Sequence, residues 1–143
     1  MNTQATPQNA LEDTKVSVKL KIASLWTSFM FLYIYVDHFV LYMPNTIANI
    51  LKGKVFVFDI TQGFIFIALF LATIPMLMIF LSIALPAKAN RLTNIIVAAV
   101  LIPYMLFNLA GEVWLHMVFA AIVEVTLLCL IIRYAWKWPR IEV

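Results

Sequence analysis

Five ionisable side chains stand within long apolar stretches of this 143-residue chain, at Asp37, His38, Glu112, His116 and Glu124. A charged group inside a membrane-spanning helix costs at least about 2.5–3.5 kcal/mol at the helix centre, so each of these residues needs a physical reason to be there. Carboxyl and imidazole groups bind cations, exchange protons and serve as general acids and bases. These five residues are therefore the candidates for a functional site.

The spacing of these residues places them on shared helix faces. Tyr33 and Asp37 are four positions apart, as are Glu112 and His116, so each pair lies on one face of a helix. Glu124 follows deeper in the same stretch, nearest to the middle of a membrane. We therefore predict a polar pocket in the outer half of the membrane, floored by Glu124. The predicted ligand- or ion-binding residues are Tyr33, Asp37, His38, Asn108, Glu112, His116 and Glu124.

Each ionisable residue also has a structural interpretation. Glu112 could mark the start of a helix, where the helix dipole favours negative charge. His38 and His116 could lie at the membrane interface or form structural hydrogen bonds. Asp37 could pair with His116 or with a lysine to fix helix packing, and a protonated Glu124 could hydrogen-bond to a neighbouring helix.

Cofactor binding is the next possibility, and we predict no cofactor. Glu112 and His116 suit metal coordination if Asp37 or His38 joins them, and the two histidines could also ligate a b-type haem. Carboxylates are unusual neighbours for haem, and nothing else marks a porphyrin pocket. The single cysteine, Cys129, excludes an intramolecular disulfide. The sequence also lacks GxSxG, HExxH, CxxC and Walker motifs, which leaves hydrolase, thiol-redox and NTPase interpretations without support.

The composition indicates that a membrane surrounds these residues. The chain is 64% hydrophobic and 12% charged, with a mean hydropathy of +0.98, whereas soluble domains are about 45–50% apolar and about 25% charged. A membrane-spanning helix needs about 20 apolar residues. Four stretches meet that need, at about 22–43, 60–85, 94–110 and 113–134. We predict an all-α bundle of four transmembrane helices in one domain, residues 15–140, after a polar tail at 1–14.

Local signals refine these boundaries. Pro75 interrupts the second stretch, so a tilt or a kink is expected there. The third and fourth stretches leave room only for a tight turn at about 109–112. The connection after the first stretch holds a possible short helix at 46–51, and Asp59 with Gln62 has the spacing of a capping box for the second.

Basic residues predict the orientation. Only Lys52 and Lys54 lie on one side of a four-span chain, and the positive-inside rule places the more basic side in the cytoplasm. The basic residues on the predicted cytoplasmic side are Lys15, Lys19, Lys21, Lys88, Arg91, Arg133, Lys137 and Arg140. Both termini are thus predicted to be cytoplasmic in a multi-pass protein of the cell membrane. The net charge of +3 suits contact with anionic lipid, and we predict no nucleic-acid partner.

Several stretches together resemble a bacterial family of small four-span membrane proteins, a domain of unknown function. They are LWTSFMFLYIYVD at 25–37, LYMP at 41–44, KVFVFDITQ at 54–62, LPAKANR at 85–91 and FNLAGE at 107–112. The resemblance implies the four-helix layout and carries no activity or site residues. A looser likeness to DoxX-like proteins rests on size and layout alone.

The leading hypothesis is a protein that binds a small molecule or an ion, extended to a proton-coupled carrier. Glu124 would exchange the proton or bind the cation, while His116 and Asp37 would orient the ligand or relay protons. An intramembrane enzyme acting on a lipid-soluble substrate would use the same groups as general acid and base. A structural or accessory subunit would need them only for assembly. A homo-oligomer is compatible with each hypothesis.

Overall fold

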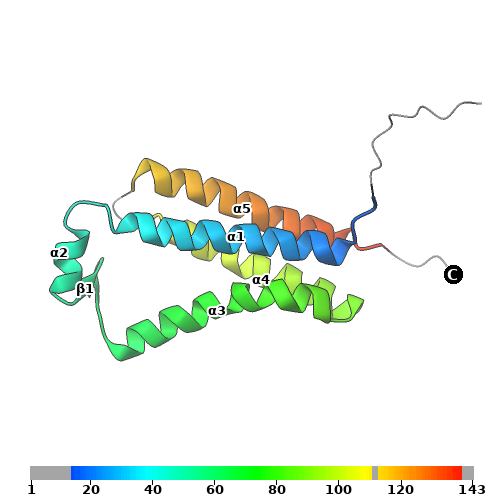
Figure 1. Ribbon diagram of the computed structural model, residues 1–143, viewed down its shortest axis with the longest axis horizontal. Coiled ribbons are helices and arrows are strands. Elements are labelled where there is room, and N and C mark those ends of the chain that lie inside the picture. The colour runs from blue at the N-terminus through cyan, green and yellow to red at the C-terminus, as the bar shows by residue number, and fades with distance from the viewer. Residues whose placement is uncertain (1–13, 111–112, 140–143) are drawn as a thin grey trace, which may run out of the picture.

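The computed structural model describes residues 14–110 and 113–139, which form four long helices, one short helix and a small hairpin (Figure 1). The elements, in order, are α1 (Val18–Val40), α2 (Thr46–Leu51), β1 (Lys54–Val55), β2 (Phe58–Asp59), α3 (Gln62–Ala84), α4 (Ala87–Phe107) and α5 (Leu115–Trp136). The long helices lie alongside one another, with α2 and the hairpin at one end of the molecule. The start of α1 and the end of α5 lie at the opposite end. Most of the described residues are helical, as predicted.

Three of the described helices are long and apolar enough to cross a membrane: α3, α4 and α5, with 23, 21 and 22 residues. At 1.5 Å per residue each helix is roughly 30 Å long, which matches the hydrocarbon core of a bilayer. Helix α1 is as long as α3. Its apolar sequence is interrupted by lysines near its start and by Asp37 near its end.

The core lies in the half of the molecule that holds the start of α1 and the end of α5. Helix α5 packs against both α1 and α4, and α1 also packs against α3. On α1, Ile22, Trp26 and Phe29 recur every three or four residues and are fully buried, as expected for the inward face of a helix. Leu128 and Ile131 of α5 meet them in the same cluster.

A buried polar cluster of Trp26, Ser82, Asn90 and Asn94 connects three helices in this core. The indole Nε1 of Trp26 donates to Oδ1 of Asn94 at 2.6 Å, and the Ser82 hydroxyl donates to the same oxygen at 3.2 Å. Nδ2 of Asn94 donates to Oδ1 of Asn90 at 2.6 Å, and Nδ2 of Asn90 donates to the carbonyl of Ser82 at 2.6 Å. Every amide and hydroxyl in the cluster thus has a partner inside the protein.

This cluster explains why α4 begins at Ala87 rather than near residue 94. A boundary drawn from apolarity places Asn90 and Arg91 in a loop, but Asn90 and Asn94 are fully buried in the first turns of the helix. Pro86, with its fixed φ, directly precedes the helix and suits its first turn. Nζ of Lys19 donates to the carbonyls of Ile83 and Leu85, at 3.0 and 2.7 Å, and so satisfies the end of α3 from α1.

The connection between α1 and α3 contains both a confirmed and a wrong prediction. The short helix predicted at 46–51 is present as α2. The capping box predicted at Asp59 and Gln62 is wrong, because α3 begins at Gln62 with Thr61 as its cap; the Thr61 hydroxyl accepts from the backbone N–H of Phe64 at 3.1 Å. Asp59 instead lies in β2, opposite Lys54 of β1.

Helix α3 is packed unevenly along its length. Its buried residues, Pro75, Met78 and Ser82, all lie in its second half. In the first half Phe66 is 70% exposed and Leu69 is 66% exposed, and Figure 1 shows this part of α3 running away from α1 toward the hairpin. A proline inside a helix removes a backbone hydrogen bond and favours a bend. The divergence of α3 opens the half of the molecule opposite the core.

Candidate functional site

A cavity of about 560 Å³ lies where α3 diverges, at the end of the molecule that carries α2. All four long helices contribute to its wall, and α2 and the hairpin cover its end. Most of its lining is apolar, including Val36, Ile67 and Met105. Its polar side chains come from α1, α2, α4 and α5.

Glu124 of α5 is the most deeply buried of these polar residues. Only 5% of its surface is exposed, and it shares its helix face with Met117 and Ala121, seven and three positions earlier. Within residues 14–110 and 113–139, no group forms a hydrogen bond with its carboxyl. A buried polar group without a partner is costly. The free hydrogen-bonding capacity of Glu124 therefore points into a space that a ligand or water can occupy.

Asp37 of α1 lines the same cavity as Glu124. Asp37 and Tyr33 line the same wall, one helical turn apart, and Asp37 is the more exposed of the two carboxyl residues. Asp37 is close enough to Glu124 for an electrostatic interaction between the two carboxyl groups. Tyr33 interacts with both carboxyl groups and with the hydroxyl of Tyr104 on α4. Asn108, one turn beyond Tyr104, completes the polar lining on that helix.

Both histidines of the predicted site lie elsewhere. His38 is exposed and contacts the Tyr42 hydroxyl, 3.4 Å from Nε2. The His116 ring packs edge-on against Trp114 with centroids 6.2 Å apart, and its buried Nε2 has no hydrogen-bond partner in the described chain. Neither residue lines the cavity. Glu112 lies outside the described residues.

The candidate metal site gains no support from this arrangement. In the part of the chain that the structure describes, no group of three or more His, Cys, Asp and Glu side chains is arranged to hold a metal ion. His38 and His116 face different neighbours, Tyr42 and Trp114.

Sequence reasoning missed the aromatic part of the lining. Tyr104 precedes Asn108 by four residues, so the pair shares a helix face, and that spacing could have identified Tyr104. Phe56, Phe58 and Phe64 approach from the hairpin and the start of α3. No sequence signal distinguishes these phenylalanines from the others of this apolar chain, since their position depends on how the hairpin folds back.

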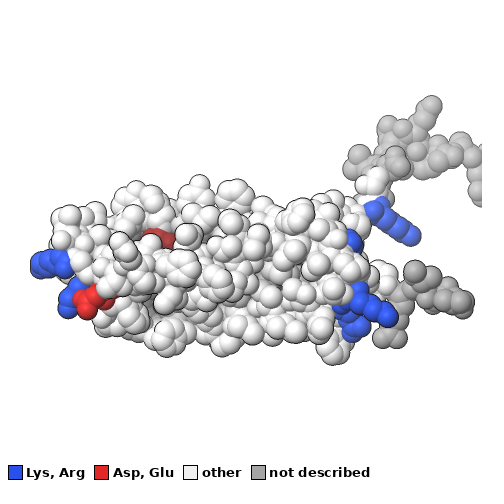
Figure 2. All heavy atoms as spheres, turned by 90° about the horizontal axis from the view of Figure 1, so that it is seen from below, with Lys and Arg blue, Asp and Glu red and all other residues white. Residues whose placement is uncertain are grey.

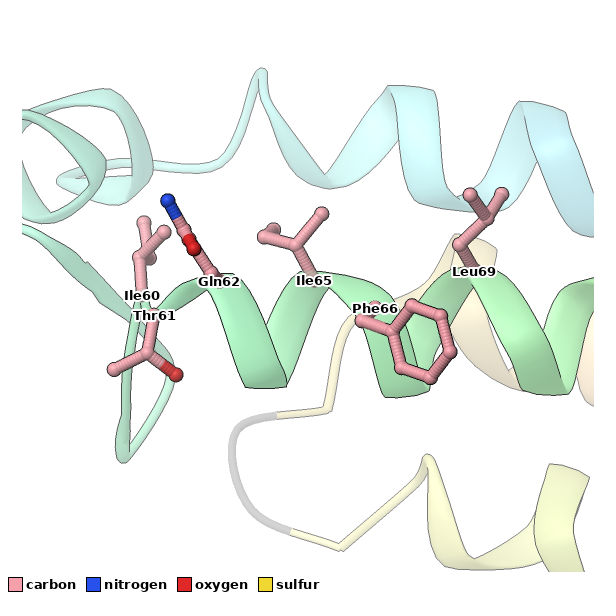
Figure 3. A pocket seen from close by; sticks show the side chains of 6 residues that line it. All are labelled: Ile60, Thr61, Gln62, Ile65, Phe66 and Leu69. Atoms are coloured by element: carbon pink, nitrogen blue, oxygen red, sulfur yellow. The ribbon is translucent and has the colours of Figure 1, made fainter.

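A second depression of about 470 Å³ lies along the start of α3. Figure 3 shows its side chains along the first turns of that helix, including Gln62, Ile65, Phe66 and Leu69. It is shallower than the cavity, and no ionisable residue lines it. Its polar groups, Thr61 and Gln62, belong to the cap and the first turn of α3.

The surface charge is distributed in a way that suits a membrane. Figure 2 shows Lys and Arg atoms at the two ends of the molecule and an almost uncharged surface between them. Acidic atoms are visible within that surface, toward the end that carries α2. Exposed apolar side chains such as Phe31, Phe70 and Phe80 cover the sides of the helices.

A family model matches residues 12–143, which include every described helix and strand. The chain belongs to the family of unknown function DUF6326. The predicted resemblance to a domain of unknown function is thereby confirmed. Because the function of DUF6326 is unknown, membership does not assign an activity to the chain. No match was found among curated proteins or among solved structures. The function of this DUF6326 member must be inferred from its cavity.

Proposed function

We propose that the chain is an integral protein of the cell membrane that is crossed by all four long helices, with both termini in the cytoplasm. Three helices have the length and apolarity of spans, and α1 matches α3 in length and lies alongside it. Exposed Phe31, Ile34 and Phe39 give α1 an apolar outer surface suited to lipid. Lys19, in the first turn of α1, contacts the end of α3. The start of α1 therefore lies at the end of the molecule where most basic residues gather, which the positive-inside rule assigns to the cytoplasm.

Within this topology the protein binds a small, lipid-soluble molecule in the cavity. The observation that carries this proposal is Glu124, which is 5% exposed, has no hydrogen-bond partner among the described residues and faces a space of about 560 Å³. Ligand pockets typically measure about 300–1,000 Å³ and combine apolar walls with a few polar groups that orient the ligand. The volume favours a molecule over a bare ion.

We propose that the carboxyl groups of Glu124 and Asp37 couple the transport of that molecule to the movement of protons. A carboxyl group can exchange a proton for a bound cation, and Glu124 and Asp37 line the same cavity and interact electrostatically. The intramembrane enzyme is the weaker candidate, because His116, its expected general base, does not line the cavity.

Photolabelling of the protein in lipid vesicles tests whether the cavity takes a ligand. The probe is a neutral alkyl alcohol that carries a diazirine, and mass spectrometry maps the labelled residues. We expect labelling within 117–124 of α5. The variant Ala68→Phe, which fills the cavity from α3, should reduce it, whereas Ala99→Phe, at an exposed position outside the cavity, should not. Labelling within 117–124 that Ala68→Phe leaves unchanged would contradict the proposal.

A further inference from the structure

The charged side chains that line the cavity are all acidic. Asp37 and Glu124 supply two carboxyl groups, while no Lys, Arg or His of the described chain lines the cavity. Lys54, the nearest basic residue along the hairpin, lies opposite Asp59 in the strand register. Glu124 in addition is 5% exposed and lacks a hydrogen-bond partner in residues 14–110 and 113–139. A negatively charged ligand would face repulsion here, and a positively charged one would find a partner.

The rest of the lining suits an organic cation rather than a metal ion. Aromatic faces attract cations through the ring quadrupole, and quaternary ammonium groups are commonly bound in aromatic cages. Six aromatic rings line the cavity, those of Tyr33, Phe56, Phe58, Phe64, Tyr104 and Phe107. A metal ion would need several ligand atoms around a small volume, which the described residues do not offer.

The cavity is open along α3. Ile67, Ala68 and Leu71 line it and are nevertheless exposed, because the first half of α3 stands away from the other helices. An opening between apolar side chains admits a molecule that dissolves in lipid. The ligand therefore combines a positive charge with an apolar body.

We propose that the cavity binds an amphipathic organic cation, such as an alkyl or aryl quaternary ammonium or phosphonium ion. Its charge lies between Asp37 and Glu124, and its apolar body lies against the aromatic rings and α3. This inference rests on the proposed ligand-binding function and adds the class of ligand.

Three photoprobes that share one diazirine-bearing alkyl chain test the charge preference. Their head groups are trimethylammonium, hydroxyl and sulfonate, and zwitterionic phosphatidylcholine vesicles avoid attraction of the probes to the lipid. We expect the ammonium probe to label 117–124 at about tenfold lower concentration than the hydroxyl probe, and the sulfonate probe to label it least; tenfold corresponds to about 1.4 kcal/mol. Tetraphenylphosphonium should compete with the ammonium probe, whereas tetraphenylborate, similar in size and opposite in charge, should not.

Variants of the carboxyl residues connect this preference to the cavity. Glu124→Gln and Asp37→Asn should each remove most of the preference for the ammonium probe, and Asp59→Asn, a carboxyl change outside the cavity, should preserve it. Because Asp37 is exposed, Asp37→Asn provides the test if Glu124→Gln fails to fold.

The outcomes separate this inference from the proposed function. Equal labelling by the ammonium and hydroxyl probes, or a preference that both carboxyl variants retain, would overturn the cation assignment and leave the ligand-binding function standing. No labelling within the cavity by any of the three probes would overturn both.

Discussion

Glu124 and Asn94 show two different states of a buried polar side chain. Asn94 is fully buried and exchanges hydrogen bonds with Trp26, Ser82 and Asn90. Glu124 is almost as buried, yet it faces a cavity and has no such partner among the described residues. A satisfied polar group stabilises the packing of helices, whereas an unsatisfied one needs water or a ligand. The two residues therefore predict different consequences of mutation.

Replacing Glu124 by Gln should weaken the pH dependence of ligand binding and leave only the part that Asp37 contributes. Protons compete with a cation for a carboxylate, so binding to the native protein should weaken as the pH falls. The other titratable groups of the lining are Asp37 and Tyr33 on α1 and Tyr104 on α4. Titrating photolabelling by the trimethylammonium probe from pH 5 to pH 8 measures the effect. An unchanged pH profile in Glu124→Gln would reject the role of this carboxyl.

Replacing Asn94 by Leu should lower the free energy of unfolding by about 1–2 kcal/mol, because it leaves the indole N–H of Trp26 without its acceptor. Unfolding by a denaturing detergent, followed by circular dichroism, measures the loss. Trp26→Phe should cost less in the Asn94→Leu background than in the native chain. Asn49→Leu, at an exposed position of α2, is the control and should have little effect; additive costs of the two core substitutions would refute the coupling.

At the scale of elements, α3 has two halves with different roles. The second half supplies Met78 and Ser82 to the core, and the Lys19 side chain satisfies its final carbonyls. The first half, preceding Pro75, diverges and forms a wall of the cavity with Ile67 and Leu71. The position of one proline thus separates a packed segment from a segment that opens a binding space.

Replacing Pro75 by Ala should bring the first half of α3 closer to α1, since the change restores a backbone donor and removes the clash of the ring with the preceding turn. Spin labels at Phe31 and Phe66, both exposed, report the separation by pulsed electron resonance. We expect a shorter distance and weaker photolabelling of the cavity. Pro103→Ala, in α4, is the matched control and should leave the α1–α3 distance unchanged. An unaltered distance in Pro75→Ala would show that the proline does not set the divergence.

At the scale of the whole molecule, the packed core and the cavity lie toward opposite ends, and Met105 of α4 belongs to both. The core and the polar cluster lie toward the end that holds the start of α1 and the end of α5, where most basic residues gather, and the cavity lies at the end with α2. In the proposed topology the first end faces the cytoplasm, so the cavity lies in the outer half of the membrane. The packed core holds the helices together at the first end, while the cavity leaves the other end open for a ligand.

Single cysteines introduced into a Cys129→Ala background test this topology. With four spans, Lys15→Cys and Lys137→Cys lie on the cytoplasmic side and Lys54→Cys lies outside; all three positions are exposed. In intact cells a membrane-impermeant maleimide should modify only Lys54→Cys, and after permeabilisation it should modify all three. Equal reactivity of Lys15→Cys and Lys54→Cys in intact cells would show that α1 does not cross the membrane.

The sequence by itself determined the helical and apolar character of the chain, the short helix at 46–51 and the family resemblance. These properties depend on runs of apolar residues and local turn signals, which each segment carries independently of its neighbours. Only the tertiary structure decided that Asp37, Glu124, Tyr33 and Asn108 line one cavity while His38 and His116 do not. It also decided that α4 begins at Ala87, through contacts of Asn90 and Asn94 with other helices. The physical reason is that the direction in which a helix face points depends on how that helix rotates and crosses against its partners, and packing between distant segments determines both.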